Sequence, residues 1–477
     1  MMDVDESTLL LVANLRVDSD SNESSRKVSL LDGITFKLQE GETVGIIGES
    51  GSGKSLLLKA ILGMVSTSAG AAYFAAPIDS MKKAASLEER YKGELPETGN
   101  DRSELLQLRS NYSISGRQTG TIRKIKKNVQ VVFQDPRTSL DPKKTVWEAI
   151  AESFKRATDL TDSEIEARVK EASAAAGLRE TDLVKYPQEL GVEQMQIVNI
   201  IRTISVEPRI AILDDPTSAM DTSAQAQILN TLRDYQYARG VSYLVASNDL
   251  NAIRVLSDRV IVLYHGRVLE YSSTLNIYTG MLHPFTKMLI ANSLSLQTPR
   301  SSLDNALSDH VPLNTLLPRG CIFHTRCPVA FKDCGWSPSE LKDLILEVLI
   351  VNRKATLSLF PAHKDVRSVD ESDEIHITFE GNSRVSYEFV EELNRLIEAR
   401  SMLEGGKRLE AVKGIELSPT GDDVIIKVRK PQTPPLMEVR PGHFAACFQY
   451  GGIEEEPKDE PGKPQEEKAP EVSNDQS

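Results

Sequence analysis

An eight-residue stretch rich in glycine and serine, GESGSGKS, constrains the fold of this chain more than any other segment. It consists of Gly48, Glu49, Ser50, Gly51, Ser52, Gly53, Lys54 and Ser55. An apolar run precedes it and a helix-forming run follows it, which is the context of a phosphate-binding loop between a strand and a helix. In such a loop backbone N–H groups surround phosphate oxygens, the lysine reaches the outer phosphates, and the final hydroxyl can ligate Mg²⁺. The stretch predicts a nucleotide site; the alternative is a Gly-rich turn without a ligand.

The composition is that of a globular protein without a nucleic-acid footprint. A chain of 477 residues has room for roughly two to four domains. The net charge of −13 argues against nucleic acid as a partner, because such proteins normally carry a basic surface. No apolar window has the length of a membrane span, and the N-terminus lacks the features of a secretory signal. We therefore expect a cytoplasmic protein.

Two further apolar runs end in polar residues suited to Mg²⁺. Residues 129–133 are expected to form a central strand that ends at Gln134, whose amide oxygen can lie near a nucleotide-bound Mg²⁺. Residues 209–213 form a second strand signal that ends in Asp214 and Asp215. A carboxylate at the end of a strand can hold Mg²⁺ beside a phosphate loop, although it can also be a helix cap.

The remaining pattern predicts an α/β fold with a parallel sheet. Short strands are expected at 9–17 and 34–38, and buried strands within 242–264. The polar region 66–127 shows no sustained periodicity and is expected to be loop with short elements. Residues of about 137–205 are expected to form a helical subdomain inserted into the sheet.

The order of five segments closely resembles that in the ATP-binding subunits of ABC transporters. The segments are GESGSGKS, VVFQDPRTSLDP, YPQELGVEQMQIV, AILDDPTSAMD and LVASNDL. Part of the second segment, FQDPRTSLDP, resembles the oligopeptide and dipeptide importer branch, and so do three further segments: DTSAQAQIL, HPFTK and GCIFHTRCPVAFKDC. The likeness covers roughly residues 8–340 and 437–450.

The resemblance implies a P-loop ABC-type nucleotide-binding domain within residues 1–295. It implies that ATP and Mg²⁺ lie between this domain and a second ABC ATP-binding subunit, with Ser55, Gln134 and Asp214 around the Mg²⁺. It further implies two transmembrane permease subunits, an extracytoplasmic solute-binding protein, and a peripheral location on the cytoplasmic face of the cell membrane. The imported solutes would be oligopeptides, dipeptides or oligosaccharides.

Departures from the family pattern predict weak hydrolysis. The family's LSGGQ signature reads LGVEQ at 190–194, where Glu193 adds a charge that repels phosphate. Asp215 replaces the usual glutamate base and is one methylene shorter, and Asn248 replaces the usual histidine. No aromatic residue precedes Phe36, so an aromatic platform for adenine is missing. We expect a chain that binds ATP but hydrolyses it poorly, with turnover in the partner's site of a heterodimer.

All four cysteines of the chain fall in segments that resemble the importer branch. They are Cys321, Cys327, Cys334 and Cys447. The resemblance implies a 4Fe-4S cluster in a C-terminal module of residues 296–340 and 437–453. A zinc ion bound by the same four thiolates is less favoured, and free thiols are the third alternative.

The cysteine module is interrupted by a segment that the family normally lacks. Within 341–436, strands are expected at 355–360, 374–379, 415–417 and 424–428, and an amphipathic helix at 387–403. This pattern predicts a small α/β domain, either a packing appendage or a regulatory or partner-binding unit. The acidic tail 454–477 is expected to be disordered.

Two functions from other classes stay open at this point. The chain could be a soluble ABC-type protein that uses ATP binding as a switch in an assembly without transport. It could also be an iron-sulfur redox protein with a vestigial nucleotide domain, although no second cofactor motif supports that. The HPFTK segment and the cysteine segment favour the transport subunit.

Overall fold

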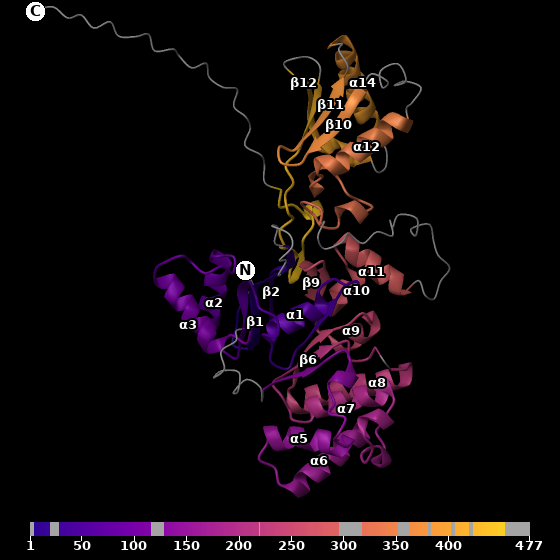
Figure 1. Cartoon of the computed structure of the whole chain (residues 1–477). Coiled ribbons are helices and arrows are strands. Elements are labelled where there is room, and N and C mark those ends of the chain that lie inside the picture. The colour runs from indigo at the N-terminus through magenta and orange to yellow at the C-terminus, as the bar shows by residue number, and fades with distance from the viewer. Residues whose placement is uncertain are drawn as a thin grey trace, which may run out of the picture.

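The computed structural model describes residues 4–19, 28–115, 128–218, 220–294, 317–351, 363–379, 383–401, 406–418 and 423–453. Three sheets organise these residues. As Figure 1 shows, a central sheet lies between a helical lobe at the bottom and a smaller sheet with two helices at the top. No helix within the described ranges has both the length and the apolar character that crossing a membrane requires.

The central sheet has eight strands in the order β14-β15-β9-β8-β3-β7-β6-β5. Its parallel part consists of β3 (Thr43–Ile47), β5 (Val129–Val132), β6 (Ile210–Asp214), β7 (Ser242–Ala246) and β8 (Arg259–Tyr264). Most residues of these strands are buried, as expected for a parallel sheet covered on both faces. The strand before Gln134, expected to be central, is instead the edge strand β5.

The other edge of the central sheet is antiparallel and includes the C-terminal part of the chain. β9 (Arg267–Ser273) pairs with β8, and the hairpin of β14 (Met437–Arg440) and β15 (His443–Ala445) pairs with β9. A buried contact of 2.7 Å between His443 Nε2 and the Glu270 carboxylate strengthens this junction. The segment that carries Cys447 is therefore anchored on the same sheet as the phosphate loop.

A second sheet with two helices corrects the expectation of a loop at 66–127. β1 (Thr8–Asp18) pairs with β2 (Ser29–Gln39) and with β4 (Ala69–Phe74), and the helices α2 (Ile78–Arg90) and α3 (Asn100–Tyr112) pack nearby. The fully buried Glu88 accepts hydrogen bonds from Tyr73 and Arg109. α2 carries buried apolar residues at helical spacing, which the expectation overlooked, whereas α3 buries only two leucines and gives a weak signal. Residues 116–127 lie outside the described part of the chain.

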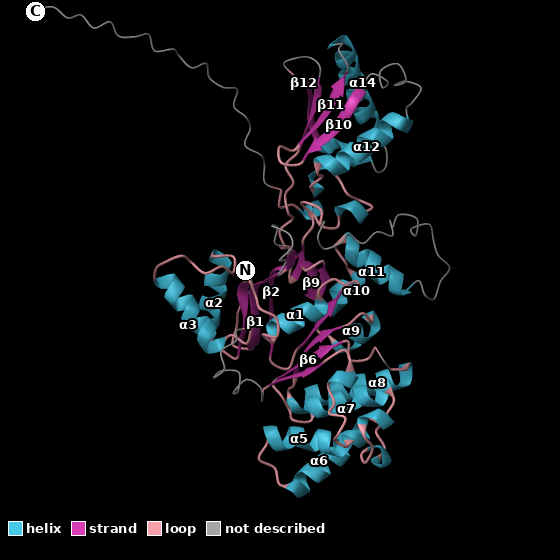
Figure 2. Ribbon diagram, in the orientation of Figure 1, coloured by secondary structure: helices cyan, strands magenta, loops and turns pink. Residues whose placement is uncertain are grey.

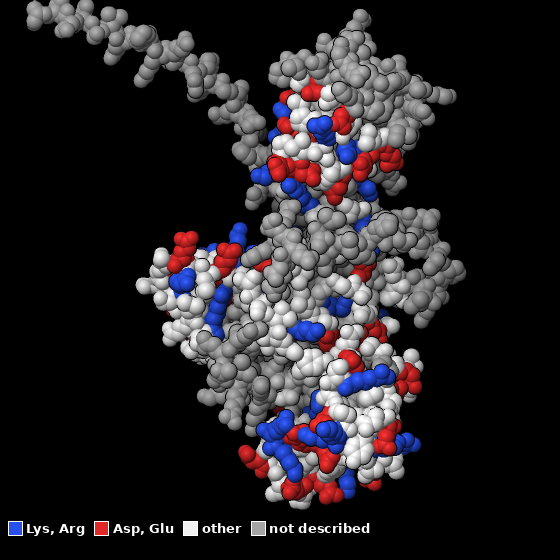
Figure 3. All heavy atoms as spheres, viewed as in Figure 1, with Lys and Arg blue, Asp and Glu red and all other residues white. Residues whose placement is uncertain are grey.

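Helices cover the central sheet and form the helical lobe (Figure 2). Around the sheet lie α1 (Lys54–Ile61), α8 (Thr222–Arg239), α9 (Leu250–Leu256), α10 (Thr274–Thr279) and α11 (Pro284–Leu294), and the lobe contains α5 (Val146–Ala157), α6 (Asp162–Ala175) and α7 (Val192–Ile204). The N-caps of α5 and α6 are Thr145 and Thr161, and each forms a capping box with the glutamate three residues later. Acidic and basic side chains lie side by side on this lobe (Figure 3).

The inserted segment forms a four-stranded antiparallel sheet with two helices. The strand order is β10 (His363–Val369), β11 (Glu374–Phe379), β13 (Asp423–Val428) and β12 (Val412–Leu417), with α12 (Pro338–Val351) and α14 (Ser383–Ser401). The strands expected at 374–379, 415–417 and 424–428 and the helix are confirmed. β10 was not expected, and the strand predicted at 355–360 lies outside the described residues. The predicted boundary at 341 falls inside α12.

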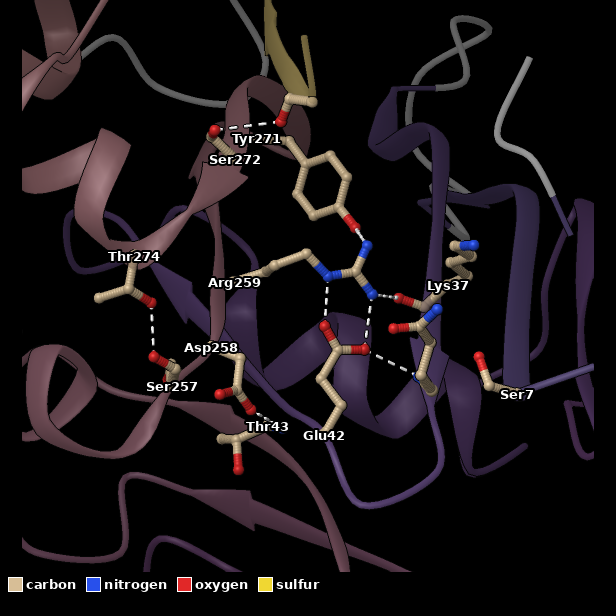
Figure 4. Close-up of polar contacts among 12 residues, drawn as sticks. Ser7, Lys37, Glu42, Thr43, Ser257, Asp258, Arg259, Tyr271, Ser272 and Thr274 are labelled. Carbon is tan, nitrogen blue, oxygen red and sulfur yellow. Dashed lines mark hydrogen bonds and ion pairs between the residues drawn. The ribbon is translucent and has the colours of Figure 1, made fainter. Parts of the chain in front are cut away.

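One arginine joins several strands at the N-terminal end of β3, where Glu42 and Thr43 lie (Figure 4). The Arg259 guanidinium contacts both oxygens of Glu42, the hydroxyl of Tyr271 and, at 3.0 Å, the carbonyl oxygen of Lys37. Its neighbour Asp258 accepts a 2.8 Å hydrogen bond from the backbone N–H of Thr43. These contacts fix the entry of the chain into β3, the strand that leads to the phosphate loop.

We predict that Arg259→Met lowers the free energy of unfolding by about 3 kcal/mol, because it leaves the Glu42 carboxylate buried without its partner. Urea unfolding measures the change. The matched control is Arg156→Met, which removes an exposed partner of Glu152 on α5 and should have little effect. Equal stability of the two variants would contradict the role assigned to Arg259.

Candidate nucleotide-binding site and cysteine site

The phosphate loop leaves β3 at Gly48 and enters α1 at Lys54. A Cβ atom on Gly48 would lie 2.1 Å from the carbonyl oxygen of Leu263, so only glycine fits there. The Lys54 Nζ donates hydrogen bonds of 2.9 Å to the carbonyl oxygens of Gly48 and Glu49. Ser50 and Gly51 are exposed at the tip. The loop therefore has the curled form, with an inward lysine, that a phosphate chain requires.

The predicted Mg²⁺ ligands meet at the carboxyl edge of the parallel sheet. The Ser55 hydroxyl donates a 2.9 Å hydrogen bond to Asp214 Oδ1, although 159 positions separate the two residues. Gln134 is exposed and lines the same cavity of about 1240 Å³ as Ser55 and Asp214. The arrangement follows from topology, because β3, β5 and β6 are parallel and their ends lie at one edge.

The Lys54 ammonium lies near several carboxylates, and burial acts on the charges of both kinds of group. Burial lowers the pKa of Lys54, whereas the nearby carboxylates of Asp215, Asp214 and Glu49 raise it. Burial also raises the pKa of Asp214, against the effect of the hydrogen bond from Ser55. A divalent cation would stabilise the ionised form of Asp214. The site thus fits a magnesium nucleotide by its charges as well as by its backbone.

Asp215 and Asn248, the two residues that the sequence led us to interpret as departures from the family's catalytic pattern, contact each other. Asp215 follows β6 with a φ of 50°, and its Oδ2 lies 3.4 Å from the Asn248 amide nitrogen. Its Oδ1 accepts a 2.8 Å hydrogen bond from the hydroxyl of Ser247, which is buried. The Asp215 carboxylate is thereby held by the end of β7. Ser247 is a contact that the sequence analysis missed, since a serine after a strand carries no distinctive signal.

The segment 190–194, which we interpret as an altered signature, leads into the start of α7. Gly191 is the N-cap, and its N–H donates a 3.3 Å hydrogen bond to the Gln194 side chain. Glu193 lies in the first turn, where a carboxylate stabilises the helix dipole. The same carboxylate would oppose a phosphate group that approached this helix end.

The four cysteines line one small cavity, together with aromatic and histidine side chains. Cys321, Cys327 and Cys334 are buried, and Cys447 is half-buried. Burial raises the pKa of the three buried thiols to about 12, about 11 and about 12 in that order, and also raises that of Cys447. Within the described ranges no group of three or more His, Cys, Asp or Glu side chains is placed to hold a metal ion. The thiols therefore share a cavity, but the structure does not show a preformed metal centre.

An arginine from the cysteine segment reaches the phosphate loop. The Arg326 guanidinium contacts both carboxylate oxygens of Glu49, at 2.8 and 2.9 Å. The sequence analysis identified Glu49 as part of the loop but not Arg326, because 277 positions separate them.

Comparisons with known proteins agree with these features. Residues 31–218 match the family described as ABC transporter, and residues 269–334 match the oligopeptide/dipeptide transporter C-terminal region. The oligopeptide transport ATP-binding protein OppF of Salmonella typhimurium is 32% identical over 338 residues, which cover 69% of this chain and 90% of that protein. The oligopeptide transport ATP-binding protein AppF of Bacillus subtilis is 33% identical over 319 residues, covering 66% and 86%. A solved dimeric ATP-binding cassette with ADP and phosphate has a TM-score of 0.45 and 22% identity, covering 56% of this chain and 99% of that one.

We predict that Lys54→Ala weakens ATP binding by roughly tenfold or more, because it removes charge-assisted hydrogen bonds to the phosphates. Equilibrium titration with a fluorescent ATP analogue measures the affinity. Lys82→Ala removes the same charge from an exposed position on α2, away from the cavity, and serves as the control. A comparable loss in both variants would mean that the loop lysine has no specific role.

Proposed function

The chain belongs to the ATP-binding proteins of ABC transporters, and we propose that it is the ATP-binding subunit of an importer for oligopeptides or dipeptides. One observation carries the proposal: a phosphate loop whose Ser55 contacts Asp214 occurs in the same chain as the oligopeptide/dipeptide C-terminal region. The names of the relatives OppF and AppF support the same class of solute. Oligosaccharides are a second class of solute for such an importer.

We propose an assembly on the cytoplasmic face of the cell membrane, with this chain as a peripheral subunit. Two permease subunits would span the membrane, a second ABC ATP-binding subunit would pair with this chain, and a solute-binding protein would deliver the peptide outside. Purification of the tagged chain from detergent-solubilised membranes tests the assembly. Recovery of permease subunits supports it, whereas recovery of the chain only from the soluble fraction would favour a switch protein without transport.

The residues of the site would have separate roles in binding. Lys54 and the loop N–H groups would hold the phosphates, while Ser55 and Asp214 would hold Mg²⁺. Gln134 would lie near the metal and respond to it. Hydrolysis needs in addition a base that activates water, and Asp215 is shorter than glutamate and is held by Ser247 and Asn248. These contacts support the proposal that this chain binds ATP but is the hydrolytically impaired member of a heterodimer.

In the complex with the second ATP-binding subunit, we predict that Asp215→Asn lowers ATP hydrolysis by less than about twofold. Replacement of the catalytic glutamate of the second subunit by glutamine should lower it by about 100-fold, because removal of a general base costs 10²- to 10⁴-fold. Phosphate release measured on both complexes compares the two sites. Undiminished hydrolysis after the change in the second subunit would refute the assignment.

We also propose that Cys321, Cys327, Cys334 and Cys447 bind a 4Fe-4S cluster. Four thiols around one cavity are a suitable donor set, and their raised pKa values mean that ligation must displace protons. The cluster would be a structural crosslink between the two halves of the cysteine module. Zinc, which also accepts four thiolates, is the less favoured occupant.

We predict that Cys447→Ser removes most of the bound iron and the visible absorbance of the purified protein. Ala446→Ser, a change at the adjacent buried position, should keep both. Metal analysis and absorbance spectra of anaerobically purified chains give the result. Stoichiometric zinc in place of iron would assign the thiols to zinc, and the absence of both metals would leave them as free thiols.

A further inference from the structure

The ion pair between Arg326 and Glu49 is largely buried and has well-defined geometry, unlike an exposed surface pair. Arg326 is the last residue of a short 3₁₀ helix, His324–Arg326, directly before Cys327. Only 8% of its side chain is exposed, and 25% of that of Glu49. Two parallel contacts of 2.8 and 2.9 Å give the bidentate geometry in which arginine binds carboxylate most strongly.

A residue of the central sheet also positions the Arg326 guanidinium beside the phosphate loop. Its Nη1 donates to the Tyr264 hydroxyl at 3.2 Å, and Tyr264 is the last residue of β8, next to β3. The group also lies 5.9 and 5.8 Å from the ring centres of Tyr264 and Phe323. Arg326 therefore lies against a pair of neighbouring aromatic rings, whose centres are 5.5 Å apart, and its guanidinium meets the Glu49 carboxylate.

Glu49 introduces a charge problem into the phosphate loop. A triphosphate and a loop carboxylate have the same sign, so an unpaired Glu49 would oppose the ligand. The charge of Glu49 acts on Lys54, whose ammonium the phosphates need. A paired carboxylate instead gives the loop a rigid anchor without net charge.

We propose that Arg326 is a positioning residue of the nucleotide site: it neutralises and anchors Glu49, so that the phosphate loop accepts ATP. The cysteine segment thereby supplies part of the nucleotide site. The position of the cysteine segment is fixed in turn by His324. The Nδ1 of His324 lies 2.7 Å from the Cys321 carbonyl oxygen, and its Nε2 lies 3.2 Å from Glu340 on α12. The proposal rests on the proposed function, because it assumes that the loop binds ATP.

Four proteins test the proposal by equilibrium titration with a fluorescent ATP analogue: the natural chain, Arg326→Gln, Glu49→Gln, and the double variant. Arg326→Gln should weaken binding by roughly five- to tenfold, the usual size of coupling between two sites. Glu49→Gln should bind at least as tightly as the natural chain, since it removes the opposing charge. The double variant should recover most of the affinity lost in Arg326→Gln, and salt should reduce the loss.

Glu42→Gln is the matched control, because Glu42 forms a buried pair with Arg259 at the opposite end of β3. It should lower the unfolding temperature without changing the affinity of the folded protein. Unchanged affinity in Arg326→Gln, or a double variant as weak as Arg326→Gln, would overturn the proposal while leaving ATP binding intact. Failure of the natural chain to bind ATP would instead overturn the proposed function and this inference with it. If Arg326→Gln does not fold, Arg326→Lys gives the same comparison, with partial loss expected and no loss contradicting the proposal.

Discussion

The alignment of parallel strands at one edge of the central sheet is the constraint on which the candidate site depends. β3, β6 and β5 place the phosphate loop, Asp214 and Gln134 at that edge. The Ser55 hydroxyl is hydrogen-bonded to Asp214, and Gln134 lines the same cavity. A lone carboxylate at this depth would be costly, and the hydroxyl partially compensates it. Buried arginine–glutamate pairs precede and follow β3, so the strand is held at both ends.

Asp215 and Asn248, which we interpret as departures from the family's catalytic pattern, form a small network with Ser247. Asp215 is bound by Ser247 and approached by Asn248, so the shorter acid and the amide that replaces histidine are mutually compatible. A neutral amide beside a carboxylate needs no change of protonation to keep this contact. The network gives a physical reason why both residues can coexist in a stable fold: the Asn248 amide donates a hydrogen bond and an Asp215 carboxylate oxygen accepts it.

Sequence reasoning was most successful where local signals and topology coincide. The phosphate loop, the run before Asp214 and the helix expected at 387–403 all have strong patterns within a few residues. α2 was missed although its buried apolar residues have helical spacing, whereas α3 buries only two leucines and is held partly by the ion pair of Arg109 with Glu88. Arg326 and Ser247 were missed for another reason. Each contacts a residue that is distant in the sequence, and spacing along the chain does not reveal such contacts.

The entry to the inserted domain and the exit from it lie together. A Cβ atom on Gly320 would be 2.9 Å from the carbonyl oxygen of Gln432, so the segments of chain that enter and leave the inserted domain touch at a neck near Gly320. Beyond that neck β14 and β15 rejoin the main sheet beside β9. The unit also contacts the cysteine segment, through Glu340 of α12 with His324 and through Arg408 with the carbonyl oxygen of Cys327. The strands beyond these contacts can change in size or sequence while the path of the chain through the nucleotide-binding core stays as it was.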